Sequence, residues 1–119
     1  MTVRQTAQLK IMPQFIYRIQ PTRLGMLTGG ATELEASIIG EHFDYLGKLV
    51  AQGVVFMAGR TLTADEKTFG IVIFAAATET EAVALMQNDP AVKLGVMKAE
   101  LFPYRIALWS PKATGTDEN

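Results

Sequence analysis

The spacing of hydrophobic positions changes along the chain, and these changes divide it into strands and helices. Residues 14–20, QFIYRIQ, alternate and are aromatic and β-branched, which indicates a strand. Apolar side chains then recur every three or four residues, which predicts a helix over about 33–52. Two apolar runs at 54–62 and 69–77, separated by the polar turn TADEK, predict a β-hairpin.

The remainder of the chain repeats this order of elements. Residues 79–87 predict a second helix, and Pro90 suits the first position of a short helical turn. Residues 96–109 predict a last strand, in which Pro103 indicates a bulge or an edge position. The order β-α-β-β-α-β is typical of an α+β, ferredoxin-like domain with a four-stranded antiparallel sheet.

Local signals mark the ends of the predicted helices. Thr32 with Glu35 has the spacing of a capping box, and so does Thr78 with Glu81. Gly53 follows the first helix and suits the left-handed conformation that often ends one. These signals place each helix start at a threonine.

The ends and one connection stand apart from the regular pattern. We divide the chain into an N-terminal extension (1–13), the ferredoxin-like domain (14–109) and a flexible tail (110–119). The segment 21–31 predicts a long loop with three glycines. Long loops in compact domains are often functional.

The predicted strands are apolar on both faces. In the run 69–77, Phe69, Ile71 and Ile73 alternate with Val72 and Phe74. Two helices cover only one face of a four-stranded sheet, and a face exposed to water should be polar. We therefore expect a homodimer that packs sheet against sheet with two-fold symmetry, a dimeric α/β barrel.

Composition excludes several classes of protein. Of 119 residues, 49% are apolar and 19% charged, the net charge is −1, and there is no cysteine. The sequence has no basic cluster of the kind that indicates nucleic-acid binding, and it has no apolar stretch long enough to span a membrane. With one histidine and no cysteine we expect no metal site, and with no glycine-rich nucleotide motif we expect no cofactor. No signal peptide is recognisable, so the expected location is cytoplasmic.

The single histidine, His42, is the most informative residue. It lies in IIGEHFDYLGKL, one helical turn from Ile38 and from Leu46, and so on the apolar face. It is either a core histidine bonded to a backbone carbonyl or a general acid–base group. Asp89 precedes Pro90 and suits a helix cap, and its carboxylate could also orient an imidazole.

The chain resembles the YCII-related family from about Phe15 to Leu108. The resemblance is carried by FIYRI, HFDYLGKLVAQGVVFMAG, GIVIFAAATETEAVALMQNDPAV and ELFPYRI. It implies a dimeric α/β barrel whose suspected active site, carried over, pairs His42 with Asp89. The chemistries assigned in the family and among its relatives concern small cyclic or aromatic compounds. Related barrels bind haem, so a haem on His42 is conceivable, although nothing else in the helix supports it.

The sequence departs from this family in two places. Many members have proline after the Ala-Gly of the second strand, where this chain has Arg60, and the loop 21–31 is longer. Arg60 could bind an anionic substrate oxygen, or it could be solvated and paired with Asp65 or Glu66.

Tyr17 and Arg18 are two further candidates for substrate binding. They point to opposite faces of the first strand, so one of them is expected to line the cavity.

Two functions fit these observations. In the first, the protein is an isomerase, lyase or dehydrochlorinase in which His42, oriented by Asp89, moves a proton on a small ring compound. In the second, it is a module without catalytic activity, either ligand-binding or stress-associated, whose pocket would hold a small hydrophobic ligand.

Overall fold

The computed structural model describes residues 12–112, so residues 1–11 of the predicted extension and 113–119 of the predicted tail lie outside it. The described elements follow the predicted order, with one short helix added. They are β1 (Gln14–Pro21), α2 (Gly25–Thr28), α3 (Glu33–Ala51), β2 (Val55–Arg60), β3 (Gly70–Ala75), α4 (Glu79–Asn88), α5 (Pro90–Lys93) and β4 (Met97–Tyr104).

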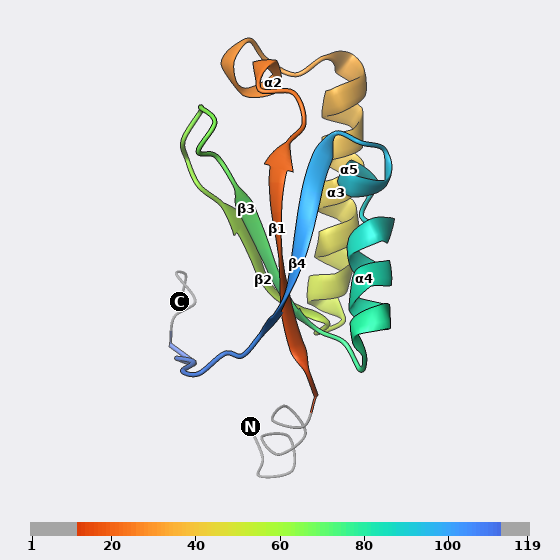
Figure 1. The fold of residues 1–119 in the computed structure, drawn as a ribbon, viewed down its shortest axis with the longest axis vertical. Helices are drawn as coiled ribbons and strands as arrows, with labels where there is room; N and C mark the ends of the chain where they lie inside the picture. Colours follow the sequence, from red (N-terminus) through yellow and green to blue (C-terminus); the bar gives the residue numbers. More distant parts are fainter. Residues whose placement is uncertain (1–11, 113–119) are drawn as a thin grey trace.

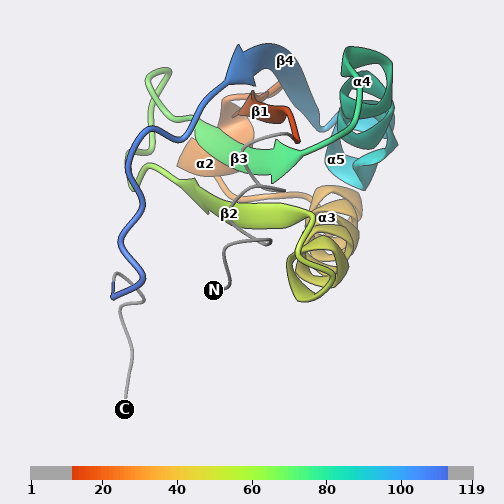
Figure 2. The ribbon, with the colours of Figure 1, turned by 90° about the horizontal axis from the view of Figure 1, so that it is seen from below.

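The strands form one antiparallel sheet in the order β2-β3-β1-β4. Helices α3, α4 and α5 all lie on one face of this sheet, and α2 lies beyond one end of it (Figure 1). The view from below shows the same two layers, with the chain after β4 running on the face away from the helices (Figure 2). The predicted α+β, ferredoxin-like fold is confirmed.

The helix ends follow the capping signals with one exception. At the start of α3, Thr32 and Glu35 form both bonds of the capping box. At the start of α4, Thr78 accepts the Glu81 N–H, but the reciprocal bond of the predicted box is not among the described contacts. After α3, Gly53 has φ 78°, the left-handed conformation predicted for it.

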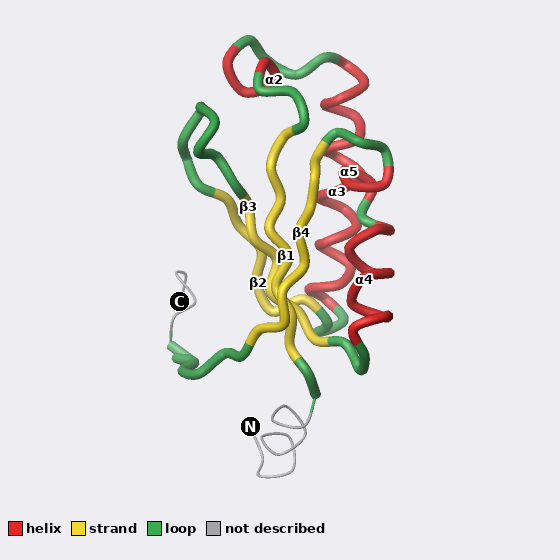
Figure 3. The backbone as a smooth tube through the Cα atoms, viewed as in Figure 1, coloured by secondary structure: helices red, strands yellow, loops and turns green. Residues whose placement is uncertain are grey.

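Two predicted boundaries differ from the structure. The loop 21–31 contains the single helical turn α2, seen in the tube trace of Figure 3. Strand β4 ends at Tyr104 rather than at residue 109. Tyr104 pairs with Gln14, the first residue of β1, so the residues beyond it have no adjacent strand to pair with in the described part of the chain.

The core lies between the sheet and the helices. Phe15 and Tyr17 of β1 and Val72 and Phe74 of β3 point into it, and all four are buried. The ring of Tyr17 packs edge-on against that of Phe74, with their centroids 5.7 Å apart. These contacts hold Tyr17 in one orientation, which matters for the site described below.

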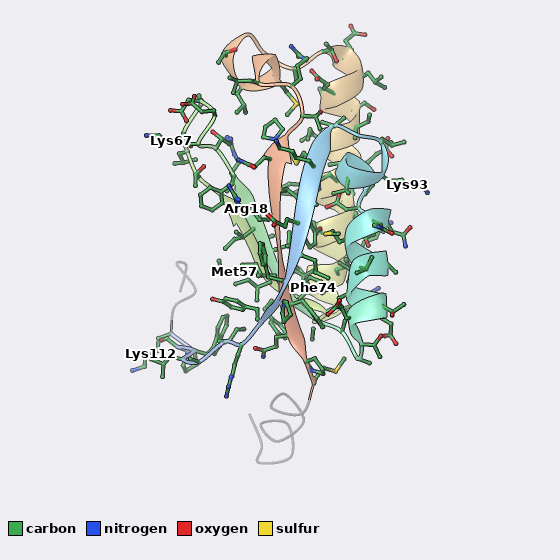
Figure 4. All side chains as sticks on the ribbon, in the orientation of Figure 1. Arg18, Met57, Lys67, Phe74, Lys93 and Lys112 are labelled. Atoms are coloured by element: carbon green, nitrogen blue, oxygen red, sulfur yellow. The ribbon has the colours of Figure 1, made fainter. Side chains whose placement is uncertain are left out.

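The other face of the sheet is partly apolar and open. Arg18 and Met57 lie on the side away from the helices (Figure 4). Phe102 and Tyr104 of β4 are about two-fifths exposed there. Within residues 12–112, no helix has both the length and the apolar character needed to cross a membrane.

Candidate active site

The break between α4 and α5 fixes the position of Asp89. Asp89 ends α4 and is the N-cap of α5, and its Oδ1 accepts the Ala91 N–H at 3.0 Å. Pro90 occupies the first position of α5, where its missing N–H costs nothing. The predicted cap is therefore present, and its carboxylate is completely buried under α3.

His42 reaches this carboxylate from the middle of α3. Its Nδ1 lies 2.7 Å from Oδ1 and 2.9 Å from Oδ2 of Asp89. The His42 side chain is 11% exposed, so it is largely shielded from bulk water. The structure brings together the two residues that the sequence assigned to a site.

Tyr17 is a third member of this cluster. Its hydroxyl donates to Oδ2 of Asp89 at 2.7 Å, from a side chain that is fully buried. Burial, with the nearby charge of Asp89, raises the pKa of Tyr17 far above its usual range. The sequence suggested Tyr17 as a substrate-binding residue, whereas here it contacts the aspartate.

The hydrogen-bond partners of Asp89 indicate which groups of the cluster carry a proton. The Ala91 N–H and the Tyr17 hydroxyl both donate to it, as suits an ionised, acceptor-only carboxylate. Nδ1 of His42 must then carry the hydrogen of its own bond to Asp89. Nε2 has no hydrogen-bond partner within residues 12–112, so in the neutral ring its lone pair is free.

A cavity of about 590 Å³ lies beside His42. Its walls come from α3, from the ends of β2 and β3, and from the first and last strands, and most of its lining side chains are aliphatic or aromatic. This volume is in the range of sites that bind small molecules. An imidazole with one nitrogen fixed and one free therefore borders an apolar space.

The segment 21–31 forms part of the cavity wall. Met26, Leu27 and Ala31 line the cavity from this segment. The Thr22 hydroxyl holds one end by donating to the carbonyl of Gly95 at 2.8 Å.

Arg23 and Glu35 tie the segment to α3. The Arg23 guanidinium donates to both carboxylate oxygens of Glu35. This bond, with the Thr32 N–H, lowers the pKa of Glu35 to about 2. The longer loop predicted from the sequence is thus a fixed wall of the pocket.

A β-bulge decides which face Arg60 occupies. Val55 pairs with Phe74 on the helix side, and the register then shifts by one residue at Phe56. Arg60 consequently pairs with Gly70 and lines the cavity. Uninterrupted alternation from Val55 would have placed it on the open face.

Arg18 lies on the other face of the sheet. Its guanidinium sits 5.3 Å from the centre of the Phe69 ring. Neither Arg18 nor Tyr17 is among the described residues that line the cavity. The expectation that one of the two lines it therefore does not hold for this cavity.

Metal ligands are not clustered in the described part of the chain. Residues 12–112 contain no group of three or more histidine, cysteine, aspartate or glutamate side chains that could hold a metal ion. An imidazole with a carboxylate as its fixed partner can transfer protons.

Comparisons with known proteins agree with this architecture. The model of the YCII-related domain matches residues 16–105. A solved structure, 5-chloro-2-hydroxyhydroquinone dehydrochlorinase (TftG) from Burkholderia phenoliruptrix AC1100 in complex with 2,5-dihydroxybenzoquinone, superposes with a TM-score of 0.57. It is 21% identical, and the match covers 76% of this chain and 93% of that one, which supports the fold alone. No curated protein matches the chain.

Proposed function

The chain belongs to the YCII-related domain family, and on this premise we propose that it is an enzyme acting on small cyclic or aromatic compounds. In this proposal His42 is the general acid–base group and Asp89 is its orienting partner. The observation that carries the proposal is the free Nε2 of an imidazole whose Nδ1 is fixed by a buried carboxylate at the edge of an apolar cavity.

The geometry supports a cycle of proton transfer at Nε2. The lone pair of Nε2 takes a proton from the substrate, and the imidazolium that forms is stabilised by the Asp89 carboxylate. Tyr17 and the Ala91 N–H keep Asp89 in place during this change of charge. The same proton then returns to another atom of the product or leaves to solvent.

Isomerisation and elimination are the reactions that need only this machinery. In a dehydrochlorination, Nε2 would remove a substrate proton, the electrons of that bond would form a new π bond, and chloride would leave with its bonding pair. The solved dehydrochlorinase with a similar fold supports this class, although its low identity does not transfer its substrate.

The proposal is tested by replacing His42 with Gln and assaying turnover of lactones and chlorinated hydroquinones. We expect loss of at least about a hundredfold in kcat/KM, in line with the usual contribution of a general acid–base group. Lys48→Gln, which changes an exposed residue of the same helix, is the matched control and should keep full activity. Full activity in His42→Gln would exclude the histidine from the mechanism.

The alternative function, a non-catalytic module for a small hydrophobic ligand, is favoured by one observation. Asp89 is already required as the N-cap of α5, so its bond to His42 could be purely structural. NMR titration of the imidazole separates the two functions. A ring that titrates and shifts when a phenolic ligand is added supports catalysis, and a ring that does neither supports the structural role.

We also propose that the protein forms a homodimer through the open face of its sheet. Support comes from the apolar side chains exposed on that face, among them Met57, Phe102 and Tyr104. Such a contact would remove these side chains from water. Sedimentation equilibrium measures the mass of the assembly directly. The cytoplasmic location stays a prediction.

A further inference from the structure

The charge of the cavity comes from one residue. Among the described residues that line it, Arg60 carries the permanent charge, and His42 and Thr68 supply the other polar side chains. No aspartate, glutamate or lysine is part of this described lining. The cavity is thus apolar with a positive group at one point, which favours an anionic ligand.

Arg60 is not neutralised by the acidic residues of the adjacent turn. Within residues 12–112, neither Asp65 nor Glu66 forms an ion pair with Arg60. The Asp65 carboxylate instead accepts the backbone N–H of Lys67 at 2.9 Å. The guanidinium therefore keeps its donors for water or for a ligand.

Threonine hydroxyls also help to close this turn. Thr63 bonds to the hydroxyls of Thr61 and Thr68, at 2.9 Å and 3.0 Å. Because these threonines satisfy one another, the hairpin does not need Arg60 for its own structure. This argues against the solvated, turn-paired arginine as a structural requirement.

The strand register sets the span between Arg60 and the proton-transfer cluster. Arg60 lies in the cross-strand row that also contains Gly70 and Ile19, and Tyr17 lies in the next row facing the helices. Two strand spacings across and two residues along separate the Cα atoms of Arg60 and Tyr17 by about 12 Å. Arg60 and His42 both line the cavity, whose volume of about 590 Å³ accommodates a small ring compound.

Gly70 keeps this part of the cavity free of side-chain bulk. A Cβ at Gly70 would lie 3.0 Å from Cγ1 of Ile19 and 3.1 Å from the carbonyl oxygen of Gly59. Glycine at this position thus lets the strands approach closely while the row ends in the long side chain of Arg60.

We propose that the substrate is a small ring compound bearing a carboxylate, and that Arg60 binds this carboxylate while Nε2 of His42 faces the opposite side of the ring. The proposal rests on the function proposed above and specifies its substrate class. A guanidinium fork matches both oxygens of a carboxylate. Arg60 is in this view the residue that determines specificity.

The test uses a pair of isosteric probes, 4-hydroxybenzoate and its neutral analogue 4-hydroxybenzamide. Binding of each to the full-length protein is measured by NMR titration. We expect the wild type to bind the acid about tenfold or more tightly than the amide, the preference typical of a charge-assisted pair. Arg60→Gln should reduce this ratio to about one.

Arg18→Gln is the matched control, because it removes the same charge from the opposite face of the same sheet. It should keep the preference of the wild type for the acid. Both variants change exposed side chains, and their amide spectra verify that they are folded.

The proposal is overturned if the wild type binds acid and amide equally, or binds neither at millimolar concentration. It is also overturned if Arg60→Gln keeps the preference or if Arg18→Gln loses it. These outcomes are separate from failure of the proposed function. If His42→Gln is inactive but the wild type shows no preference for the acid, only the carboxylate site is wrong and the acid–base role stands. If His42→Gln is fully active but the wild type prefers the acid, only the acid–base role is wrong and the carboxylate site stands.

Discussion

The two crossovers of this fold have the same position in the repeat but are built differently. The first, between β1 and β2, contains the uninterrupted 19-residue helix α3. The second, between β3 and β4, is broken at Asp89–Pro90 into α4 of ten residues and α5 of four. Both crossovers pack on the same face of the sheet (Figure 1).

This difference explains how a proton-transfer pair arises in an apolar core. A continuous helix exposes no backbone groups at its centre, so the centre of α3 can present His42 among aliphatic neighbours. A broken helix leaves free N–H groups that require a cap. Here the cap is Asp89, and because the break is buried its remaining acceptor positions are filled by His42 and Tyr17.

The largest expected effect on stability follows from removing the cap of the broken crossover. Asp89→Ala leaves the Tyr17 hydroxyl, the Ala91 N–H and Nδ1 of His42 without their acceptor in the core. We expect a loss of about 3–5 kcal/mol in the free energy of unfolding, as for other broken buried pairs. Urea denaturation measures this loss.

Thr32→Ala is the corresponding change in the continuous crossover. Thr32 also caps a helix, but its bonds with Glu35 are at the surface. We expect a loss of about 1 kcal/mol, typical of an exposed N-cap. Equal losses in the two variants would show that burial of Asp89 adds nothing to its role as a cap.

The second prediction compares the buried Tyr17 hydroxyl, which donates to a carboxylate, with the partly buried Tyr45 hydroxyl, which donates to a backbone carbonyl. Tyr17→Phe removes the donor to the Asp89 carboxylate, and Tyr45→Phe removes the donor to the backbone carbonyl of Leu85. We expect losses of about 1.5–3 kcal/mol for Tyr17→Phe and about 1 kcal/mol for Tyr45→Phe, because bonds to charged groups are stronger. Urea denaturation at neutral pH measures both.

The raised pKa of Tyr17 adds a pH dependence to this comparison. Above pH 10, the ordinary pKa of tyrosine, the unfolded chain loses the phenolic proton while the folded protein retains it. The stabilising contribution is therefore complete below pH 10 and declines above it, by about 1.4 kcal/mol per pH unit for one such group. Tyr17→Phe should flatten this decline. A decline as steep in Tyr17→Phe as in the wild type would contradict the assignment.

The extent to which the sequence predicts this site can be judged from particular residues. The apolar spacing around His42 and the cap signal at Asp89 place both residues in helices, and the family resemblance pairs them. The alternation of Phe15, Tyr17 and Ile19 places all three on the helix-facing side, but it does not predict that Tyr17 contacts Asp89. The hydrogen bond from Tyr17 to Asp89 depends on the distance between the α4–α5 break and β1. No local sequence pattern specifies this distance.

Arg60 shows a second limit of sequence-based prediction. Its face is set by one extra residue at the bulge near Phe56, and the apolar run around it gives no sign of a register shift. A shift of one residue inverts the facing of every side chain after it. Periodicity therefore predicts the strands and their order along the chain. It does not predict the face of the sheet on which Arg60 lies.

The smallest expected effect concerns the end of the continuous helix. Gly53 has φ 78°, which disfavours any side chain, so Gly53→Ala should cost about 1 kcal/mol. Gly40 lies on the exposed side of α3, where an added Cβ meets no atom within 4 Å, so Gly40→Ala should stabilise by about 0.5–1 kcal/mol. Thermal denaturation should thus show shifts of opposite sign for the same chemical change within one crossover. A stabilising Gly53→Ala would mean that the left-handed conformation of Gly53 does not end α3. The contrast between a crossover helix that ends at a glycine and one that is broken at Asp89 would then lose its physical basis.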